Sequence, residues 1–446
     1  MSVLERVREA EASQGVGDAS AEQRAEDLRR AREQLKRDLI ERLGLATIAA
    51  MLSEDDEARP RAELAVALEA ILNTGGYEAL AKAERARLAR EVVDEVCGLG
   101  PIQGLLDDPD VTEVMINGTE SLFYEKGGEL IKAEASFDSP EQITIAIDRI
   151  LAPLGRRLDR SSPLVNARLA NGDRVNAVAR PVAIDGPSVT IRKFTDSIRS
   201  LATLEELGAL PHWYAQLLSW AVYCRKSIAV SGGTGSGKTT LLNALSCEIP
   251  VGERIVTIED SAELRFDAHP NVVRLEAQDA SIEGLGAVTI RDLVKNALRM
   301  RPDRIVVGEV RGEEAIDMLQ AMNTGHDGSL TTLHAGTPEE TVMRLVLMAR
   351  FGMDLPPELI EEQVSTALDL IVMSCRLKDG RRAITELAEV SRREDGRVSL
   401  VTCVDYRLRD RSWGLVREPG FLADAVDCGL LAEGEVEAWR RSCSHR

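Results

Sequence analysis

The sequence predicts an α/β protein in which a wound α/β domain with a glycine-rich loop follows a smaller mixed α/β domain and an N-terminal helical module. Three observations support this prediction. After about residue 210, β-branched runs alternate with helical stretches, a pattern typical of a mostly parallel sheet covered by helices. A glycine-rich loop joins one of these runs to a helix. The chain before about residue 95 is rich in Ala, Glu, Arg and Leu and nearly free of strand patterns.

The helical module is predicted to span residues 1–95. Leu28–Leu35 and Ala81–Leu88 repeat apolar residues at helical spacing among many charges, which is typical of solvent-exposed helices. These charges indicate a solvated surface, so no partner site is assigned to them.

The mixed α/β domain is predicted over residues 96–194. It contains short alternating runs separated by glycine turns, with one helix over Pro140–Leu154. The expected strands are Val111–Ile116, Leu122–Glu125, Leu130–Ala133, Arg174–Arg180 and Ser188–Arg192. Residues 195–209 are predicted to form a linker that ends where a helix starts.

The wound domain is predicted over residues 210–390. Its expected strands are Ile228–Val230, Arg254–Ile258, Val272–Leu275, Arg304–Val307 and Ser329–Thr332, with helices between them. Residues 391–446 are predicted to form a C-terminal extension. Its clearest strand is Arg397–Tyr406, and Phe421–Arg440 is an amphipathic stretch.

The loop of the wound domain carries the pattern G-x-x-x-x-G-K-[ST], which is met by Gly232, Gly237, Lys238 and Thr239. Glycines let backbone N–H groups curl around an anion at a helix N-terminus, where the helix dipole also favours negative charge. Lys238 is expected to reach the β- and γ-phosphates, and the Thr239 hydroxyl to bind Mg²⁺. The predicted nucleotide-binding residues of the loop are Gly232, Gly233, Thr234, Gly235, Ser236, Gly237, Lys238, Thr239 and Thr240. The sequence therefore predicts a site for a nucleoside triphosphate.

Two later strands run into carboxylates. The first is followed by Glu259, Asp260 and Glu263, which are expected at the same edge of the sheet as the loop. Glu263 is the first candidate to polarise the attacking water, and Glu259 is the alternative. The competing interpretation is that these residues are surface carboxylates with no catalytic role. The second strand ends in Glu309 and resembles a Walker B segment, whose acid organises Mg²⁺ and water. A helix-capping role is the other reading of Glu309.

Two of the five histidines, His326 and His334, follow in one segment. Histidines beside a phosphate site can donate to the γ-phosphate and report its loss to neighbouring elements. Zinc binding is the rival reading, and the absence of a third ligand at metal spacing argues against it.

Arg174 and Arg192 belong to the turns and strands of the mixed domain. They are either solvated surface residues or arginine fingers that stabilise transition-state charge when domains or subunits close. The sequence leaves both readings open.

Composition restricts the other classes of function. The chain has 55 basic and 74 acidic residues and a net charge of −19, which argues against a surface built mainly to bind a nucleic-acid backbone. Its seven cysteines include no C-x-x-C pair, which is typical of reduced thiols. No stretch approaches the ~18 apolar residues of a membrane span. We therefore expect a soluble, cytoplasmic protein.

In this order, the motifs resemble the type II/type IV secretion ATPase superfamily, and most closely its CpaF/TadA branch, whose members power tight-adherence (Flp-type) pilus assembly. The resemblance runs from Gly98 to about Glu389. Besides the phosphate loop, it is carried by Gly155–Asp159, Ala167–Leu169, Gly172–Asn176, Ile191–Phe194, Ile258–Asp260, Leu298–Arg304, Gly308–Gly312 and Asp317–His326.

The resemblance implies a Mg²⁺-dependent ATPase that forms a homo-hexameric ring, with ATP bound between an N-terminal domain and a RecA-like domain. It implies an inner-membrane platform protein as partner, peripheral membrane association through that partner, and no nucleic-acid ligand. Glu263 would be the Asp-box glutamate and Glu309 the Walker B glutamate, and His326 and His334 would form the His box.

The resemblance also implies that Arg174 and Arg192 reach the γ-phosphate from the N-terminal domain, with Arg168 as a further candidate. Two departures from the superfamily pattern are Asn166, where Asp is usual, and Gln278, where Arg is usual. A third is Ala335-Gly336, in place of the common Ala-Asn. None of the three removes a residue of the phosphate chemistry.

Three alternatives remain open. One is a conjugative or effector type IV secretion ATPase of the same superfamily. The others are a nucleic-acid translocase on the same core and a scaffold that binds nucleotide without hydrolysing it.

Overall fold

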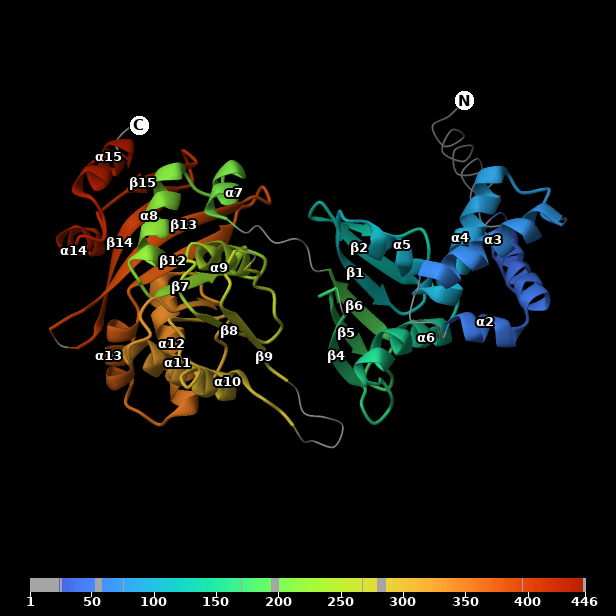
Figure 1. The fold of residues 1–446 in the computed structure, drawn as a ribbon, viewed down its shortest axis with the longest axis horizontal. Coiled ribbons are helices and arrows are strands. Elements are labelled where there is room, and N and C mark those ends of the chain that lie inside the picture. The colour runs from blue at the N-terminus through green and yellow to red at the C-terminus, as the bar shows by residue number, and fades with distance from the viewer. Residues whose placement is uncertain are drawn as a thin grey trace, which may run out of the picture. The chain divides into compact units, whose positions relative to one another are not determined.

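A computed structural model of the 446-residue chain describes residues 24, 26–52, 58–74, 76–169, 171–193, 200–266, 268–278, 286–394 and 396–443. Contacts divide the chain into two compact units, residues 1–193 and residues 194–446 (Figure 1). No helix of the described residues is long and apolar enough to cross a membrane.

The described N-terminal part of the first unit is helical. Its first helical segment covers residues 26–43, and the next are α2 (Leu45–Leu52), α3 (Ala58–Thr74) and α4 (Lys82–Cys97). Their apolar faces share one core, which contains Leu35, Leu39, Leu64, Leu68, Leu88 and Val92. The predicted boundary at residue 95 falls inside α4, because this helix continues for two more residues.

The remainder of the first unit is one antiparallel sheet with a helix packed on its apolar face. The strands are β1 (Val111–Asn117), β2 (Ser121–Lys126), β3 (Glu129–Lys132), β4 (Leu164–Arg168), β5 (Arg174–Val178) and β6 (Ser188–Arg192). They lie in the order β3-β2-β1-β6-β5-β4. The helical elements are η1 (Gly100–Ile102), α5 (Gln103–Asp107), α6 (Pro140–Leu151) and η2 (Ala152–Leu154). Of the strands, β4 was not predicted, because its five residues stand directly before a strong turn signal.

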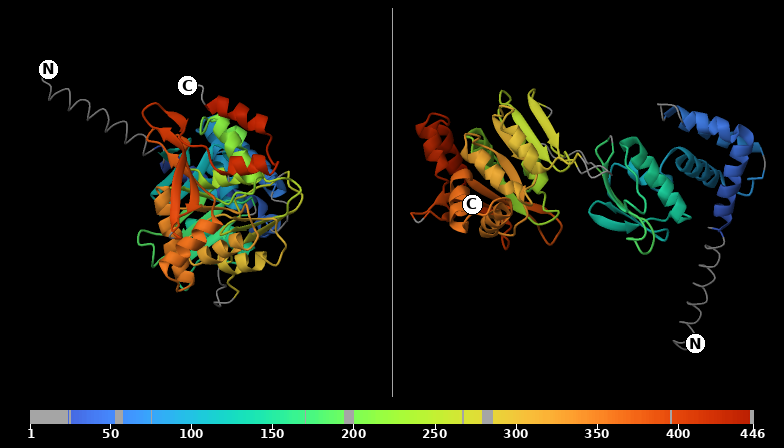
Figure 2. Two further views of the ribbon diagram at one scale, coloured as in Figure 1. Left: turned by 90° about the vertical axis from the view of Figure 1, so that its left-hand side faces the viewer. Right: turned by 90° about the horizontal axis from the view of Figure 1, so that it is seen from below.

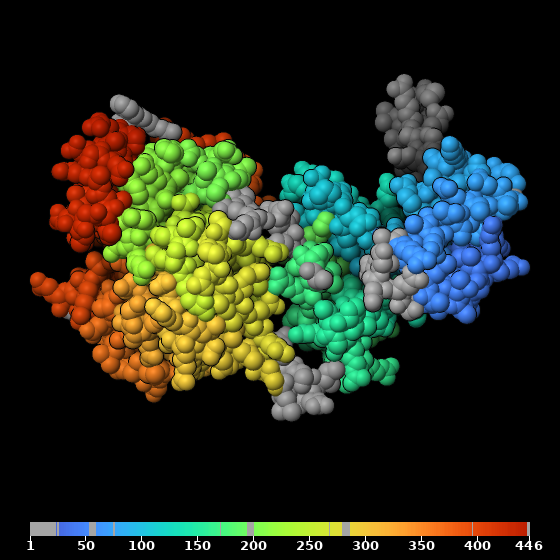
Figure 3. Space-filling model, viewed as in Figure 1, coloured from blue at the N-terminus to red at the C-terminus, as the bar shows by residue number. Residues whose placement is uncertain are grey.

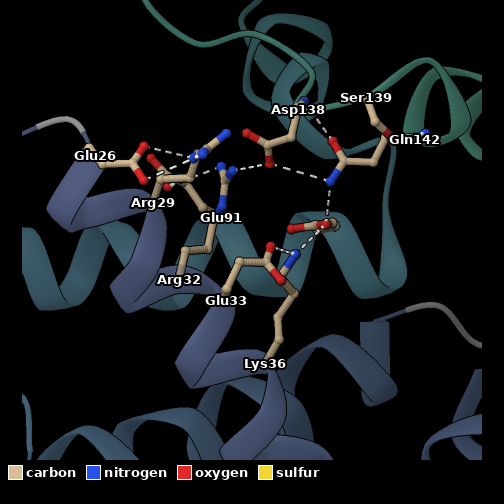
Figure 4. Close-up of polar contacts among 10 residues, drawn as sticks. Glu26, Arg29, Arg32, Glu33, Lys36, Glu91, Asp138, Ser139 and Gln142 are labelled. Carbon is tan, nitrogen blue, oxygen red and sulfur yellow. Dashed lines mark hydrogen bonds and ion pairs between the residues drawn. The ribbon is translucent and has the colours of Figure 1, made fainter. Parts of the chain in front are cut away.

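A polar contact joins the helical module to α6 (Figure 4). Arg32 forms an ion pair with Asp138, just before α6. Lys36 Nζ lies 2.7 Å from Glu95 Oε1, and that oxygen also accepts a 3.0 Å hydrogen bond from Gln142 Nε2. The apolar cores of the helical module and of the sheet remain separate clusters, so charged groups supply much of this contact.

The second unit is a nine-stranded sheet covered by helices on both faces (Figures 1 and 2). The strand order is β15-β14-β13-β12-β7-β11-β10-β8-β9. The strands are β7 (Ile228–Gly232), β8 (Ile255–Glu259), β9 (Val272–Glu276), β10 (Arg304–Val307), β11 (Leu330–Leu333), β12 (Leu370–Arg376), β13 (Arg382–Arg392), β14 (Val398–Arg407) and β15 (Ser412–Leu415). Pairing is parallel from β12 to β9 and antiparallel from β12 to β15.

Two apolar clusters lie on the two faces of this sheet. One contains residues of α7 (Leu201–Glu206), α8 (His212–Tyr223), α9 (Lys238–Cys247), α14 (Phe421–Asp427) and α15 (Glu433–Cys443). The other contains residues of α10 (Ile290–Ala297), α11 (Glu314–Asn323), α12 (Pro338–Gly352) and α13 (Pro357–Ala367). Every residue of β7, β8, β10 and β11 is buried, as expected for parallel strands covered on both sides. This is the predicted α/β class, with a RecA-like wound sheet.

In the second unit, the structure differs from the predicted domain boundaries at two places. Within the predicted linker, residues 201–206 form α7, whose Leu201 and Leu204 are buried against the second unit; residues 194–199 lie outside the described part. At the other end, β13 crosses the predicted boundary at residue 390. The C-terminal extension continues the sheet and packs on α8, because its apolar residues complete the core there (Figure 3).

Trp439 anchors the C-terminal extension to α8. Its side chain is 1% exposed, and its Nε1 donates a 2.7 Å hydrogen bond to the Trp213 carbonyl oxygen. Its ring also meets the rings of Trp213 and Trp220 edge-on. The extension is therefore part of the core of the second unit.

Replacing Trp439 by Ala should destabilise the second unit by about 3–5 kcal/mol, because it opens a cavity and removes this hydrogen bond. All four tryptophans lie in the second unit, so intrinsic fluorescence during urea unfolding reports on this unit alone. Arg440→Ala, which changes an exposed ion pair with Glu418, is the control and should leave the midpoint almost unchanged. Equal midpoints for Trp439→Ala and wild type would contradict a structural role for the extension.

Candidate functional site

The parallel strands bring the predicted site residues to one edge of the sheet. β11 lies between β7 and β10, and β8 follows β10. Because parallel strands end at the same edge, the loop after β7, His334 after β11, Glu309 after β10 and Asp260 after β8 all emerge there.

The glycines of the loop are required by its backbone. A Cβ on Gly232 would stand 2.1 Å from the carbonyl oxygen of Ser374, which is too close for any side chain. Gly235 and Gly237 have φ of 70° and 94°, in the left-handed region that favours glycine. Gly237 caps α9, so the helix begins at Lys238 and its free backbone N–H groups face the loop. The geometry is that of an anion-binding loop.

Lys238, His334 and Glu309 form a connected chain of side chains. Lys238 Nζ donates a 3.0 Å hydrogen bond to the Gly233 carbonyl oxygen and lies 3.3 Å from His334 Nδ1. His334 Nε2 lies 2.8 Å from Glu309 Oε1, although the angles are not those of a hydrogen bond. Burial lowers the pKa of Lys238 and of His334, and the Lys238 charge lowers the pKa of His334 further. A phosphate group beside Lys238 would oppose both effects.

Arg311, which was not predicted as a site residue, connects Glu309 with Asp260. Its Nη2 donates a 2.6 Å hydrogen bond to Glu309 Oε2, and its Nη1 donates a 3.3 Å bond to Asp260 Oδ2. The hydrogen bond to Glu309 raises the pKa of Arg311, and the charges of Glu309, Asp260 and Glu263 raise it further. The signal in the sequence was an arginine two residues after the strand-end glutamate.

Glu309 does not cap α11. Both of its carboxylate oxygens face the site residues His334 and Arg311. The backbone N–H groups of Arg311 and Gly312 donate instead to Glu314 Oε1. This excludes the helix-capping reading of Glu309.

Glu259 braces the loop after β8 instead of facing the phosphate site. The residue is 2% exposed, and its Oε1 accepts hydrogen bonds of 2.8 Å and 3.0 Å from the backbone N–H groups of Glu263 and Leu264. Burial raises the pKa of Glu259 to about 7. Of the two acids considered for polarising water, Glu259 therefore positions Glu263.

His326 lies at the opposite edge of the sheet from the loop. Leu330 is paired with Ile228 at the start of two parallel strands, so residues before Leu330 are at the amino-terminal edge. His326 Nδ1 contacts the Ala321 carbonyl oxygen at 3.1 Å and closes the turn after α11. The structure therefore does not bring His326 to the edge where His334 lies, because the whole of β11 separates them.

The three candidate arginines form one row across the first unit's sheet. Arg168 is paired with Arg174, Arg174 with Arg192, and Arg192 with Glu113. Directly opposed residues point to the same face of a sheet. Here it is the face away from the core, because neighbouring residues such as Val175 are buried. The sequence could not predict this row without the register of β4.

Two of the three departures from the superfamily pattern, Asn166 and Gln278, form contacts away from the phosphate loop. Asn166 Oδ1 accepts a 2.9 Å hydrogen bond from Asn176 Nδ2 on the same sheet face as the arginines. Gln278 pairs with Val288 through two backbone hydrogen bonds, and residues 279–285 between them lie outside the described part.

The described residues contain no group of three or more His, Cys, Asp or Glu side chains placed to hold a metal. The predicted Mg²⁺ ligands are the Thr239 hydroxyl and the Glu309 carboxylate, which are hard oxygen donors of the kind Mg²⁺ prefers. This set fits an ion that arrives with its own phosphate ligands and water.

A glycine-rich anion loop between a buried strand and a helix, with acids at the ends of neighbouring parallel strands, defines a P-loop nucleotide-binding protein. Residues 95–383 match the family described as Type II/IV secretion system protein. The chain is 38% identical over 319 residues to a putative conjugal transfer protein of Mycobacterium tuberculosis (strain CDC 1551 / Oshkosh), covering 70% of this chain and 90% of the relative. It therefore belongs to the type II/IV secretion system protein family.

The chain is also similar to other proteins and solved structures. The chain is 35% identical over 304 residues to the type IV secretion system protein VirB11 of Brucella suis biovar 1, covering 61% of this chain and 83% of the relative. The crystal structure of the Brucella suis VirB11 ATPase with sulphate is 33% identical and covers 64% of this chain and 91% of that chain, with a TM-score of 0.36. The pilus retraction motor PilT with bound ADP is 21% identical and covers 68% and 82%, with a TM-score of 0.47.

Glu259 should make stability depend on pH. Its folded pKa of about 7 lies above the usual value of 4.5 for a glutamate, so its contribution to stability is complete below pH 4.5 and is lost as the pH rises through 7. From pH 5 to pH 8, wild type should lose about 2–3 kcal/mol relative to Glu259→Gln, which cannot ionise. Urea unfolding followed by tryptophan fluorescence measures both proteins at each pH. Parallel stability profiles for the two proteins would rule out this burial effect.

Proposed function

We propose that this protein is an ATPase that drives a type II/type IV secretion or pilus machine. The observation that carries the proposal is the chain Lys238–His334–Glu309 beside the phosphate loop. A loop alone would bind nucleotide, whereas hydrolysis also needs an acid and a group that responds to the γ-phosphate. Membership of the secretion family supplies the context for the activity.

Binding would begin with exchange of partners at Lys238. Its ammonium group leaves the Gly233 carbonyl oxygen and binds the β- and γ-phosphates, while the loop N–H groups hold the other oxygens. His334 then lies between the γ-phosphate and Glu309, where it can pass a change at the phosphate to β10 and β11. Mg²⁺, with Thr239 and Glu309 as ligands, would neutralise developing charge on the phosphates.

Glu263 is the residue we propose to orient the attacking water. Two backbone hydrogen bonds to Glu259 hold the turn on which Glu263 stands. Arg311 links this turn to Glu309 through Asp260. Glu263, which would orient the water, and Glu309, which would bind Mg²⁺, would thus be held at a fixed distance and orientation.

The arginine row of the first unit would provide the remaining positive charge. Arg192 is exposed on the outward face of its sheet, and Arg174 stands beside it. We propose that closure of the first unit of this or another subunit brings these guanidinium groups to the γ-phosphate. Hydrolysis would then depend on domain position, which is what a motor requires.

Within the family, we propose assembly of a tight-adherence (Flp-type) pilus as the task, following the CpaF/TadA resemblance. A homo-hexameric ring on the cytoplasmic side, working on an inner-membrane platform protein, belongs to the same proposal. The conjugative alternative has a specific observation in its favour, since the 38% identical relative is named a putative conjugal transfer protein. Co-purification with a pilus platform protein or with a mating-channel component would distinguish the two.

Replacing Lys238 by Ala should lower ATP turnover at least about a hundredfold with the fold retained, because the γ-phosphate loses its charged partner. Phosphate release measures turnover, and tryptophan fluorescence checks folding. Lys226→Ala is a matched control, since Lys226 lies just before β7, at the opposite edge of the sheet from the phosphate loop, and pairs with Asp369. Undiminished magnesium-dependent turnover in Lys238→Ala would refute the proposed ATPase.

Arg192→Ala should reduce turnover by about a thousandfold and leave ADP affinity nearly unchanged, because an arginine finger acts on transition-state charge. Turnover and ADP titration are measured on the same preparation. Arg157→Ala is the control, since Arg157 is an exposed arginine of the same unit that pairs with Asp159. Similar losses in both variants would indicate a general charge effect and not a finger.

A further inference from the structure

The face of α6 that meets the helical module is polar. Asp138 lies just before the helix, and Gln142 and Arg149 follow on the same side, two helical turns apart. The opposite side of α6, which carries Ile143 and Ile147, is buried in the core of the sheet. The module therefore rests on the outward, polar face of α6, and the apolar face is already used by the sheet.

Charged groups cross from this face to the module. Arg32 forms an ion pair with Asp138, and Gln142 Nε2 donates a 3.0 Å hydrogen bond to Glu95 Oε1 (Figure 4). Arg149 Nη1 donates to the carbonyl oxygens of Glu95 and Gly98, at 2.8 Å and 2.5 Å. These carbonyls lie at the C-terminal end of α4, where the helix dipole favours a cation. Each of these contacts thus depends on a charge or on a helix dipole.

The apolar cores on the two sides of this contact are separate. The module has its own core, with Leu64 and Leu88, and the sheet has another, with Val114 and Ile147. Ile145, on the outward face of α6, is 51% exposed, so the module leaves half of it uncovered. Because the hydrophobic contribution follows the apolar area removed from water, separating the two parts would expose neither core and would cost mainly polar contacts.

Water and salt reach the ion pair at one side. A cavity of about 310 Å³ opens beside Asp138 and is lined by Arg29, Arg30, Glu33 and Arg37. The pairing is also incomplete, since the buried Nε of Arg32 has no hydrogen-bond partner among the described residues. Ion pairs that solvent can reach contribute little net stability, and salt screens them further. The contact is therefore suited to opening and closing.

A single stretch of backbone joins the two parts. The last module helix, α4, ends at Cys97, and the sheet portion begins with η1 at Gly100. Gly100 has φ of 64°, a conformation that residues with a Cβ rarely adopt. Between these elements, Gly98 is extended, with φ of −119° and ψ of −152°. Two glycines within three residues give this connection the freedom of a hinge.

We propose that the helical module is held on α6 by a charge latch and detaches from it as a folded unit, turning at Gly98–Gly100. The charge latch consists of Arg32, Glu95, Asp138, Gln142 and Arg149. Its opening uncovers the outward face of α6 and frees the C-terminal end of α4, while both apolar cores stay intact. This inference concerns the first unit alone, so it does not depend on the proposed ATPase activity.

The test follows chymotrypsin cleavage of the full chain after Leu99, inside the hinge, with the fragments identified by mass spectrometry. Raising sodium chloride from about 0.05 M to about 0.5 M should speed this cleavage about tenfold, because the latch is screened and cleavage reports the open population. Rates are divided by the cleavage rate of a peptide of residues 96–103 in the same buffer. Far-UV circular dichroism should stay constant, since the module remains helical.

Charge reversal tests the latch itself. Asp138→Arg should speed the cleavage about tenfold at low salt, because Arg32 then faces a like charge. Combining it with Arg32→Asp should restore most of the slow cleavage, since the ion pair is formed again with its charges exchanged. Arg59→Ala is the matched control, because Arg59 pairs only within α3, with Glu63, in the described part of the chain. This control should cleave like wild type.

Each of the contrary results would overturn the proposal. Equal wild-type rates at the two salt concentrations would exclude a charge latch. An Asp138→Arg rate no higher than that of Arg59→Ala would exclude Asp138 from holding the module. Failure of Arg32→Asp to slow the cleavage of Asp138→Arg would show that the two side chains do not act as a pair. Faster cleavage with a loss of helical signal would show that the module unfolds and does not detach intact.

Discussion

The parallel pairing of β12, β7, β11 and β10 is the constraint on which the site depends. It places the phosphate loop, His334 and Glu309 at one edge although they are far apart in sequence. The pairing of β7 with β12 is so close at the loop that only glycine fits at position 232, beneath the Ser374 carbonyl oxygen. Burial of every residue in β7, β11 and β10 constrains their register, because a one-residue slip would move each side chain from one apolar core to the other, where it does not fit.

Charges at this edge are arranged for a ligand that brings more negative charge. Lys238 is partly desolvated, and its ammonium group contacts the Gly233 carbonyl oxygen and His334 Nδ1. Glu309 is held between His334 and Arg311. Arg311 satisfies Glu309 Oε2, whereas the buried Glu309 Oε1 has no hydrogen-bond partner among the described residues. Each of these contacts is one that a phosphate or a metal can replace. The free site is therefore stable and preorganised, so little ordering cost falls on the binding step.

The sequence predicted the residues whose role follows from local pattern. The loop, the strands beside it, Lys238 and Glu309 belong to this class. β4 and the row formed by Arg168, Arg174 and Arg192 were missed because they depend on cross-strand register, which local pattern does not encode. His326 and His334 illustrate the same limit. They are eight positions apart, but β11 lies between them, so they stand at opposite edges of the sheet. The C-terminal extension was set apart for a similar reason, because Trp439 contacts residues 226 positions away.

The proposed function divides the work between the two units. The phosphate loop, Lys238 and Glu309 all belong to the second unit, so this unit would supply the groups that bind the phosphates. The arginine row of the first unit faces outward from its sheet and would act on the γ-phosphate. Movement of the first unit would then change the rate of hydrolysis much more than nucleotide affinity. A motor of this design would keep its nucleotide bound between cycles, and the position of the first unit would control when hydrolysis occurs.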